Sequence, residues 1–300
     1  MLMNTHEARL DALRTELKRR DLDGFVVPIS DEHMSEYVGG YAQRLAWLTG
    51  FGGSAGSAAV LANEAAMFVD GRYTLQVREQ VEERLFSYQS TLSTSIPAWL
   101  ARHAPAGGRI GFDPWLHGQP WVAACDAALK ANGASMVAVE SNPIDAVWAD
   151  QPAPSLAPAV IHDTEFAGQS SEAKRSEVAE WLTTRGLDAA VISALDGVAW
   201  LLNLRGSDVE RTPVALSFVL AHADGTAELF IAEEKVTPEL RAHLGNAVTI
   251  CPREMFVAQL QALSGKRVAV DPERSVAAVF TALAGEIGRA SCRERVCYPV

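Results

Sequence analysis

A pattern that occurs twice constrains the fold of this chain more strongly than any other feature of its sequence. In residues 44–73 an apolar segment with Trp47 leads into a glycine-rich turn, and two short apolar runs joined by a turn follow. Residues 198–209 repeat the start of this pattern around Trp200, and a second pair of apolar runs follows there too. A helical pattern and a buried apolar run precede both copies. One order of elements used twice predicts two duplicated domains.

Predicted helices and strands alternate along most of the chain. We expect helices at residues 4–20, 95–103, 119–131, 171–185 and 275–285, and one after Asp70 with Tyr73, Val77, Val81 and Leu85 on one face. We expect strands at residues 24–27, 58–62, 65–69, 109–113, 135–140, 187–192, 214–221 and 227–231. Asn4 and Glu7 predict a capping box at the start of the first helix. This alternation indicates an α/β fold in which mixed sheets are flanked by helices.

A proline-rich stretch gives the best boundary between the two domains. Residues 151–159 carry three prolines, and prolines at this density favour an extended, semi-rigid chain. We therefore predict a first domain over residues 1–150, this linker, and a second domain over residues 160–287. The first copy is longer than the second by 12 residues between its strand and its tryptophan. The polar stretch at residues 30–41 is the predicted insertion.

The last residues, 288–300, do not fit either copy. They lack a helical or strand period, place Cys292 and Cys297 close together, and reverse the charge of the chain. We interpret them as a non-native tail and leave them out of the fold. The natural chain is then expected to continue beyond this sequence.

The composition limits partners and compartment. The formal net charge is −11 and no basic stripe is present to meet phosphates, which argues against nucleic acid as a partner. No apolar run approaches about 18 residues, and the N-terminus lacks the layout of a signal peptide, so we expect no membrane contact. Four cysteines without a disulfide framework suit a reducing compartment. We expect an acidic protein of the cytoplasm.

Two functional motifs can be projected onto the glycine-rich turn. Residues 52–56 match G-x-S-x-G, which would make Ser54 the nucleophile of a serine esterase. Residues 50–55 match G-x-G-x-x-A, with Asp70 about twenty residues further on, as in a dinucleotide site. Both motifs require a helix directly after the turn, whereas the sequence predicts a hairpin there. The structural alternative is that the glycines permit a tight turn and that Asp70 caps the following helix.

Longer motifs indicate a family. Those in the first half that resemble the first domain of Xaa-Pro aminopeptidase (aminopeptidase P) are residues 31–37 (DEHMSEY), Arg44, residues 50–56 (GFGGSAG) and residues 70–73 (DGRY). Those in the second half that resemble the second domain of its three-domain form are residues 198–209 (VAWLLNLRGSDV), Pro213 and Ser217-Phe218. The resemblance covers residues 1–287. It departs at Thr212, where the family is expected to have asparagine.

The resemblance implies a fold and an activity. This family is similar to creatinase and prolidase, with two creatinase N-terminal-like α/β domains before a catalytic domain. The catalytic domain binds two divalent metal ions, manganese or zinc, which activate the water that cleaves the bond before a penultimate proline. The implied partners are peptides with a penultimate proline, the chain's own catalytic domain, and a second subunit in a homodimer. Because that domain would follow residue 287, the resemblance implies the N-terminal portion of a metallopeptidase, a hydrolase, that is inactive alone.

The residues themselves offer no separate catalytic centre. The seven histidines are scattered, and the pair with helical ligand spacing, His33 and Glu36, sits in a loop-like stretch. We therefore predict no catalytic residue, metal ligand or cofactor in this chain. The candidates to shape substrate access are His33, Tyr37, Arg44, Arg72, Arg205 and Asp208. The alternative for the charged ones is an intramolecular ion pair or a turn cap.

A second class of function stays open. Two domains without a catalytic cluster are also compatible with a standalone, non-enzymatic module for binding or oligomerisation.

Overall fold

The computed structural model describes residues 5–284 and divides the chain into two compact units. The first unit comprises Met1–Asp31 and Gly40–Ala153, and the second comprises Glu32–Gly39 and Pro154–Val300. The division after Ala153 falls within the proline-rich stretch, and residues 151–159 hold no helix or strand. The loop Glu32–Gly39 belongs to the second unit although both of its flanks belong to the first. The tail predicted at residues 288–300 lies outside the described residues.

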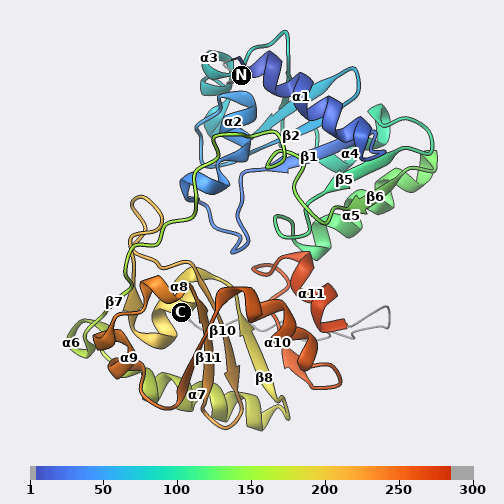
Figure 1. The fold of residues 1–300 in the computed structure, drawn as a ribbon. Helices are drawn as coiled ribbons and strands as arrows, with labels where there is room; N and C mark the ends of the chain where they lie inside the picture. Colours follow the sequence, from blue (N-terminus) through green and yellow to red (C-terminus); the bar gives the residue numbers. More distant parts are fainter. Residues whose placement is uncertain (1–4, 285–300) are drawn as a thin grey trace. The chain divides into compact units, whose positions relative to one another are not determined.

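A six-stranded mixed sheet forms the centre of the first unit (Figure 1). Its strands are β1 Gly24–Pro28, β2 Gly56–Leu61, β3 Ala65–Val69, β4 Ser87–Ser90, β5 Arg109–Phe112 and β6 Ser135–Ala138, in the order β4-β3-β2-β1-β5-β6. β1 pairs antiparallel with β2, and β2 pairs antiparallel with β3 in the predicted hairpin. The pairs β3–β4, β1–β5 and β5–β6 are parallel.

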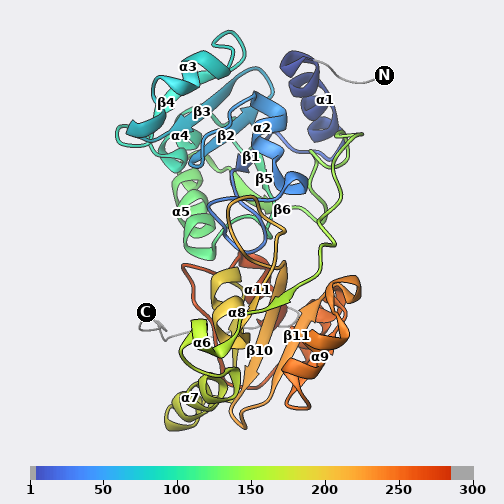
Figure 2. The same ribbon diagram turned by 90° about the vertical axis from the view of Figure 1, so that its left-hand side faces the viewer.

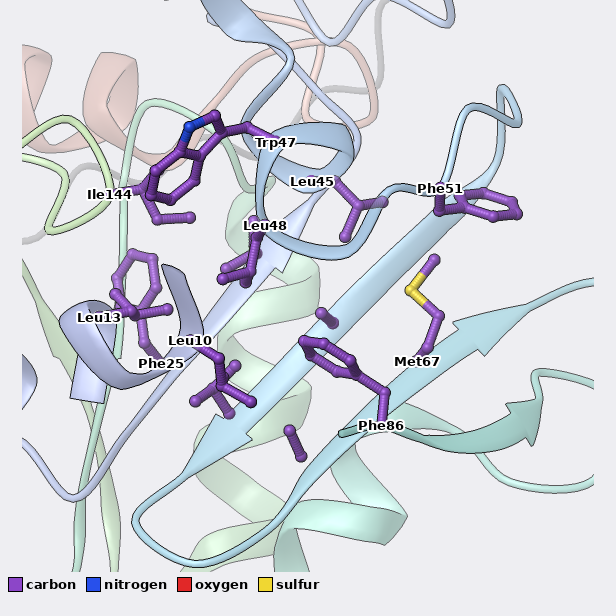
Figure 3. Packing of buried hydrophobic residues seen from close by; sticks show 14 of the residues in the cluster. Leu10, Leu13, Phe25, Leu45, Trp47, Leu48, Phe51, Met67, Phe86 and Ile144 are labelled. Atoms are coloured by element: carbon purple, nitrogen blue, oxygen red, sulfur yellow. The ribbon is translucent and has the colours of Figure 1, made fainter. Parts of the chain in front are cut away.

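Alternate side chains of β1 enter two separate cores, as the two-residue period of a strand requires. Phe25 and Val27 face helices α1 (His6–Arg19) and α2 (Arg44–Thr49). Val26 faces helices α4 (Ile96–His103) and α5 (Gln119–Leu129) on the opposite side. Figure 3 shows the first of these cores. The labelled residues come from α1, α2, strands β1 and β3, the turn between α2 and β2, the residue before β4 and the segment after β6: Leu10, Leu13, Phe25, Leu45, Trp47, Leu48, Phe51, Met67, Phe86 and Ile144.

The sheet of the second unit repeats this topology with five strands among the described residues. They are β8 Ala189–Ile192, β10 Ser217–His222, β11 Ala227–Ile231, β12 Val248–Cys251 and β13 Val268–Ala269, in the order β12-β11-β10-β8-β13. β8–β10 and β10–β11 are antiparallel, and β11–β12 and β8–β13 are parallel. These four pairings have the same order and sense as those of β1 to β5, so the predicted duplication is confirmed.

Helices cover both faces of the second sheet (Figure 2). Helices α7 (Ser171–Thr184), α8 (Leu195–Leu202) and α9 (Pro238–Leu244) share one core with the sheet. On the other face Phe256, the first residue of α10 (Phe256–Ala262), stacks on Phe218 of β10 at 4.1 Å between ring centres. Helix α11 (Ala277–Ala284) packs beside α10. A separate ribbon pairs β7 (Val160–Ile161) with β9 (Leu204–Arg205), and the short helix α6 (Thr164–Ala167) comes directly after β7.

Two local predictions were wrong. Helix α1 is capped by Thr5, whose side chain accepts a hydrogen bond from the amide of Ala8, so the predicted box with Asn4 is not used. Asn4 itself lies outside the described residues. The long helix predicted after Asp70 is broken into a 3₁₀ turn (Gly71–Tyr73) and the five-residue helix α3 (Gln76–Gln80). Val81 takes up an extended conformation and ends α3.

Further short 3₁₀ turns lie at Gly40–Ala42, Lys130–Asn132, Glu233–Lys235 and Arg253–Met255. None of the helices in residues 5–284 combines the length and the apolar character that crossing a bilayer demands.

Candidate functional site

Two candidate arginines of the first unit are held by carboxylates of the same unit. Arg44, the first residue of α2, forms a two-pronged pair with Asp145, with Nε–Oδ1 and Nη2–Oδ2 distances of 2.7 and 2.8 Å. Arg72 binds Asp70 in the same way, and Asp70 also accepts a hydrogen bond from the amide of Arg72. The predicted cap at Asp70 is therefore present. The Arg44 side chain is largely buried and orients the helix that carries Trp47, whereas the Arg72 side chain is exposed; the carboxylates of Asp145 and Asp70 are each about one third exposed.

The candidate loop residues lie in the second unit. His33 is 2% exposed, and its ring lies 4.4 Å from that of Phe218. Its Nδ1 is 2.8 Å from the carbonyl oxygen of Ser193, so Nδ1 carries a proton and donates it. Its Nε2 lies 3.2 Å from Nη2 of Arg253 and 3.8 Å from Oε1 of Glu32. The polar loop is thus fixed by buried hydrogen bonds.

Arg253 holds a second residue of this loop. Its guanidinium forms an ion pair with Glu32 and lies 5.2 Å from the centre of the Phe218 ring. Together, Glu32, His33 and Arg253 form what we call the loop clasp. The clasp anchors the start of Glu32–Gly39 to the second sheet.

A pocket of about 470 Å³ opens beside this loop, within the second unit. Its lining comes from residues 33–37, from the start of α8 (residues 194–196), from Thr212 and Val214, and from Glu273 and Arg274. Tyr37 stands 52% exposed at the pocket, whereas His33 is buried in its wall. Arg274 bridges to Asp196 at 3.1 Å across the pocket wall. Carboxylates outnumber guanidinium groups in this lining, which favours polar or cationic groups over anions.

The remaining two candidates shape the turn that supplies Thr212 and Val214. Asp208 is buried: its Oδ2 accepts from the amide of Leu216 at 2.6 Å and from Nζ of Lys235 at 2.5 Å. Arg205 donates through Nη1 to the carbonyl oxygens of Ala199 and Leu204, at 3.0 and 2.9 Å, and so secures the end of α8. Both side chains position backbone within the fold, and their role in substrate access stays a prediction.

The glycine-rich turn has a structural explanation. Strand β2 begins at Gly56, two residues after Ser54, where a nucleophile elbow or a dinucleotide site requires a helix. Ser54 Oγ lies 2.9 Å from the hydroxyl of Tyr73. A side chain at Gly53 would place its Cβ 2.4 Å from the ring of Phe51, so the turn packs too tightly for any other residue. These contacts favour a structural role for the glycines over a serine nucleophile and over a dinucleotide site.

A dinuclear metal site does not fit the residues that the structure describes. No three His, Cys, Asp or Glu side chains between residues 5 and 284 come together in a way that could hold a metal ion. The pair with ligand spacing, His33 and Glu36, is unsuited to the task because both ring nitrogens of His33 are already hydrogen-bonded.

Comparison with known proteins identifies both units. The family model described as "Creatinase/Prolidase N-terminal domain" matches residues 9–146, and a second model of the same description matches residues 150–296. The chain belongs to the creatinase/prolidase N-terminal domain family. It carries this creatinase N-terminal domain twice, which agrees with the duplicated sheets.

Relatives of this pair of creatinase N-terminal domains are longer proteins. A probable Xaa-Pro aminopeptidase P of Aspergillus niger is 36% identical over 259 residues, which are 85% of this chain and 42% of the relative. A probable Xaa-Pro aminopeptidase P of Aspergillus clavatus is 37% identical over 87% of this chain and 40% of the relative. The chain therefore spans about two fifths of the length of these curated relatives.

One solved structure matches nearly the whole chain. The X-prolyl aminopeptidase of Caenorhabditis elegans, described as a cytosolic enzyme with a di-nuclear active site, superimposes with a TM-score of 0.88 and 30% identity. The match covers 94% of this chain and 49% of that enzyme. The resemblance to the N-terminal part of Xaa-Pro aminopeptidases is thereby confirmed.

Several residues at these sites escaped the sequence analysis. Asp145, Lys235 and Arg253 hold the candidates Arg44, Asp208 and His33 in place, and they lie 27 to 220 residues away from them along the chain. Asp196, Glu273 and Arg274 line the pocket without belonging to any motif. A weak signal was present at Asp271-Pro272, which repeats Asp113-Pro114 after the equivalent strands and marks the turn before Glu273.

Proposed function

We propose that this chain is the N-terminal, non-catalytic portion of an Xaa-Pro aminopeptidase, which removes the residue before a penultimate proline by metal-dependent hydrolysis. The superposition on about half of the Caenorhabditis elegans enzyme carries the proposal, because it includes both creatinase N-terminal domains and their connection. The rest of such an enzyme would supply the two divalent metal ions, manganese or zinc, and the catalytic groups. In this portion we assign no catalytic residue and no metal ligand.

The role we propose for the two domains is to shape substrate access and assembly. The pocket beside Glu32–Gly39 supports this role, since a loop with an exposed Tyr37 and a buried anchor presents a rigid, polar surface. Its substrates would be peptides with a penultimate proline, and its partners the catalytic domain and a second subunit. We place the protein in the cytoplasm, as the Caenorhabditis elegans enzyme is described as cytosolic.

A peptidase assay tests the proposal. The 300-residue chain is incubated with manganese and an Xaa-Pro peptide, and release of the first residue is followed by mass spectrometry. We expect no release above the metal-only control, and release by a longer protein whose reading frame continues past residue 288. Proline-specific release by the 300-residue chain itself would overturn the assignment of an inactive portion.

The standalone binding or oligomerisation module remains the alternative. A genuine stop in the gene directly after this chain, with no companion gene for a catalytic part, would favour it. The serine esterase hypothesis is tested with a serine-reactive phosphonate. We expect Ser54 to stay unlabelled, because its hydroxyl contacts the hydroxyl of Tyr73 and it lies in the turn before β2.

A further inference from the structure

The two copies share a local arrangement around a tryptophan. In the first copy Arg9 lies four residues after the helix cap Thr5, and its guanidinium is 5.1 Å from the centre of the Trp47 ring. The same guanidinium donates to the carbonyl oxygen of Trp47 at 2.6 Å. Trp47 comes three residues before Gly50, which ends α2 in the left-handed conformation.

The second copy reproduces every part of this arrangement. Lys174 lies four residues after the helix cap Ser170, and its Nζ is 5.0 Å from the centre of the Trp200 ring. Nζ also donates to the carbonyl oxygen of Trp200 at 3.0 Å. Trp200 comes three residues before Asn203, which ends α8 in the left-handed conformation. The two tryptophans are therefore equivalent positions of one scaffold.

The copies differ in what covers the ring. Trp47 is 8% exposed because Trp148, from the segment that follows β6, stacks on it at 5.5 Å with an angle of 22° between the rings. The turn that carries Trp148 is held in place by the pair between Asp145 and Arg44. Trp200 is 45% exposed. The second copy thus presents the ring that the first copy buries.

We propose that Trp200 is a docking point for an aromatic side chain from the part of the protein that follows the second domain, in the place that Trp148 takes in the first. This inference rests on the proposed function, because it requires a longer protein. Aromatic rings that are fixed from beneath and open above are typical anchors of an interface, since little side-chain entropy remains to be lost.

The duplication itself says where the occupant should lie. Helix α11 follows β13 as α5 follows β5, and Trp148 comes 19 residues after Leu129, the end of α5. Helix α11 is described as far as Ala284, and the same interval counted from there reaches beyond residue 300. The occupant therefore belongs to chain that the relatives have and this sequence does not, since the sequence spans about two fifths of their length.

The docking contact must differ from the first copy in one respect. Gly197 stands where Arg44 stands, three residues before the tryptophan, so the ion pair with an equivalent of Asp145 cannot form. The cations beside Trp200 are Lys174 and Arg205, whose Nη1 binds the carbonyl of Ala199. An aromatic ring in a segment with acidic character therefore fits this surface better than a basic one.

Fluorine NMR of 5-fluorotryptophan tests the docking. The Trp200 resonance is assigned with Trp200→Phe, and its shift between H₂O and D₂O reports solvent contact. We expect a solvent-sensitive Trp200 in the 300-residue chain and a protected one in the longer protein, with Trp47 protected in both. A longer protein that cleaves Xaa-Pro peptides while Trp200 stays solvent-sensitive would overturn the docking and leave the proposed function standing.

Two other outcomes are equally decisive. Protection of Trp200 in the 300-residue chain that disappears on dilution would make a second copy of this chain the occupant and would overturn the proposal. A reading frame that ends at residue 300 would overturn the docking and the proposed function together.

Substitution in the longer protein gives an independent measurement. Trp200→Ala should increase the rate of limited proteolysis after residue 284 between about twofold and tenfold, the range for loss of one aromatic pair. Trp200→Phe, which keeps a ring, should restore most of the protection. In the 300-residue chain Trp200→Ala should leave the thermal midpoint of unfolding nearly unchanged. If Trp200→Ala lowers the thermal midpoint equally in the 300-residue chain and in the longer protein, the role of Trp200 is purely structural and the docking is overturned.

Discussion

Asp208 and Lys235 face each other inside the second unit with side chains almost removed from solvent. Asp208→Ala would leave the ammonium of Lys235 buried without a counter-charge and the amide of Leu216 without an acceptor. Breaking a buried pair from one side costs about 3–5 kcal/mol. We therefore expect the free energy of unfolding of the second unit, measured with urea, to fall by that amount. As a control, Glu210→Ala removes half of an exposed pair with Arg211 and should change stability by less than about 0.5 kcal/mol.

Glu16 gives the first unit a predictable response to acid. Hydrogen bonds from Arg19 and then Arg20 lower the pKa of Glu16 from 4.5 to about 2, although burial opposes them. Because the folded pKa lies below the unfolded one, the stabilisation is complete above about pH 4.5 and is lost as the pH falls towards 2. The stability difference between the wild type and Glu16→Gln should therefore shrink across this window.

The measurement for Glu16 is urea unfolding at several pH values between 6 and the lowest at which the protein still folds. Glu79→Gln, at an exposed position of the same unit, is the matched control. A difference between the wild type and Glu16→Gln that stays constant below pH 4.5 would show that the carboxylate is not held by these arginines.

For single residues, only contacts between neighbours in the sequence could be predicted. The cap of Asp70 on Arg72 was predictable because the two residues are neighbours in a turn. The partner of Arg44 was not, since Asp145 lies 101 residues away and nothing in either motif indicates the contact. The candidate site residues were found as motif members, but the residues that orient them were not.

The loop Glu32–Gly39 is an element without secondary structure that is nevertheless ordered by the loop clasp. Arg253→Met keeps an unbranched apolar side chain at this position but removes the guanidinium that lies over Phe218, donates to His33 and balances the charge of Glu32. Amide hydrogen exchange in Glu32–Gly39 should become at least about tenfold faster, equivalent to the net value of one or two charge-assisted hydrogen bonds.

The control for the loop clasp is Arg241→Met, which removes an exposed pair with Glu233 in the same unit. We expect exchange in Glu32–Gly39 to stay at the wild-type rate in that variant. Unchanged exchange in Arg253→Met would mean that the loop is held by its backbone alone.

Element types followed from periodicity where a segment was long, and failed where a local conformation intervened. The stripe of Tyr73, Val77 and Val81 predicts one helix, but Val81 is extended and ends α3, and its side chain still reaches the first core without a continuous helix. The hairpin β2–β3 was predicted correctly, and that single result separated the structural explanation of the glycine turn from the two catalytic motifs. The sequence could not predict that Glu32–Gly39 packs in the second unit, because a polar composition does not indicate which domain a loop contacts.

The whole molecule is a duplicated scaffold whose copies are not interchangeable. The order and sense of four strand pairings recur, and so does the cation beneath the tryptophan. What differs is what each copy receives from elsewhere in the chain: the first keeps Trp148 over its tryptophan, and the second takes in Glu32–Gly39. A loop inserted in the first copy therefore acts as structure for the second.

This exchange makes a prediction about dissection of the chain. A fragment of residues 154–300 lacks Glu32–Gly39, so the ring of Phe218, the carbonyl of Ser193 and the guanidinium of Arg253 lose their contacts with the loop. If the loop contributes about 2 kcal/mol, a unit of this size should melt roughly 4–8 °C below the corresponding transition of the whole chain. Adding a synthetic peptide of residues 32–39 should recover part of the difference by binding the folded fragment. The same peptide with His33→Ala should recover less of the difference in melting temperature. If the fragment has the melting temperature of the whole chain, and neither peptide changes it, the loop contacts the second unit without stabilising it.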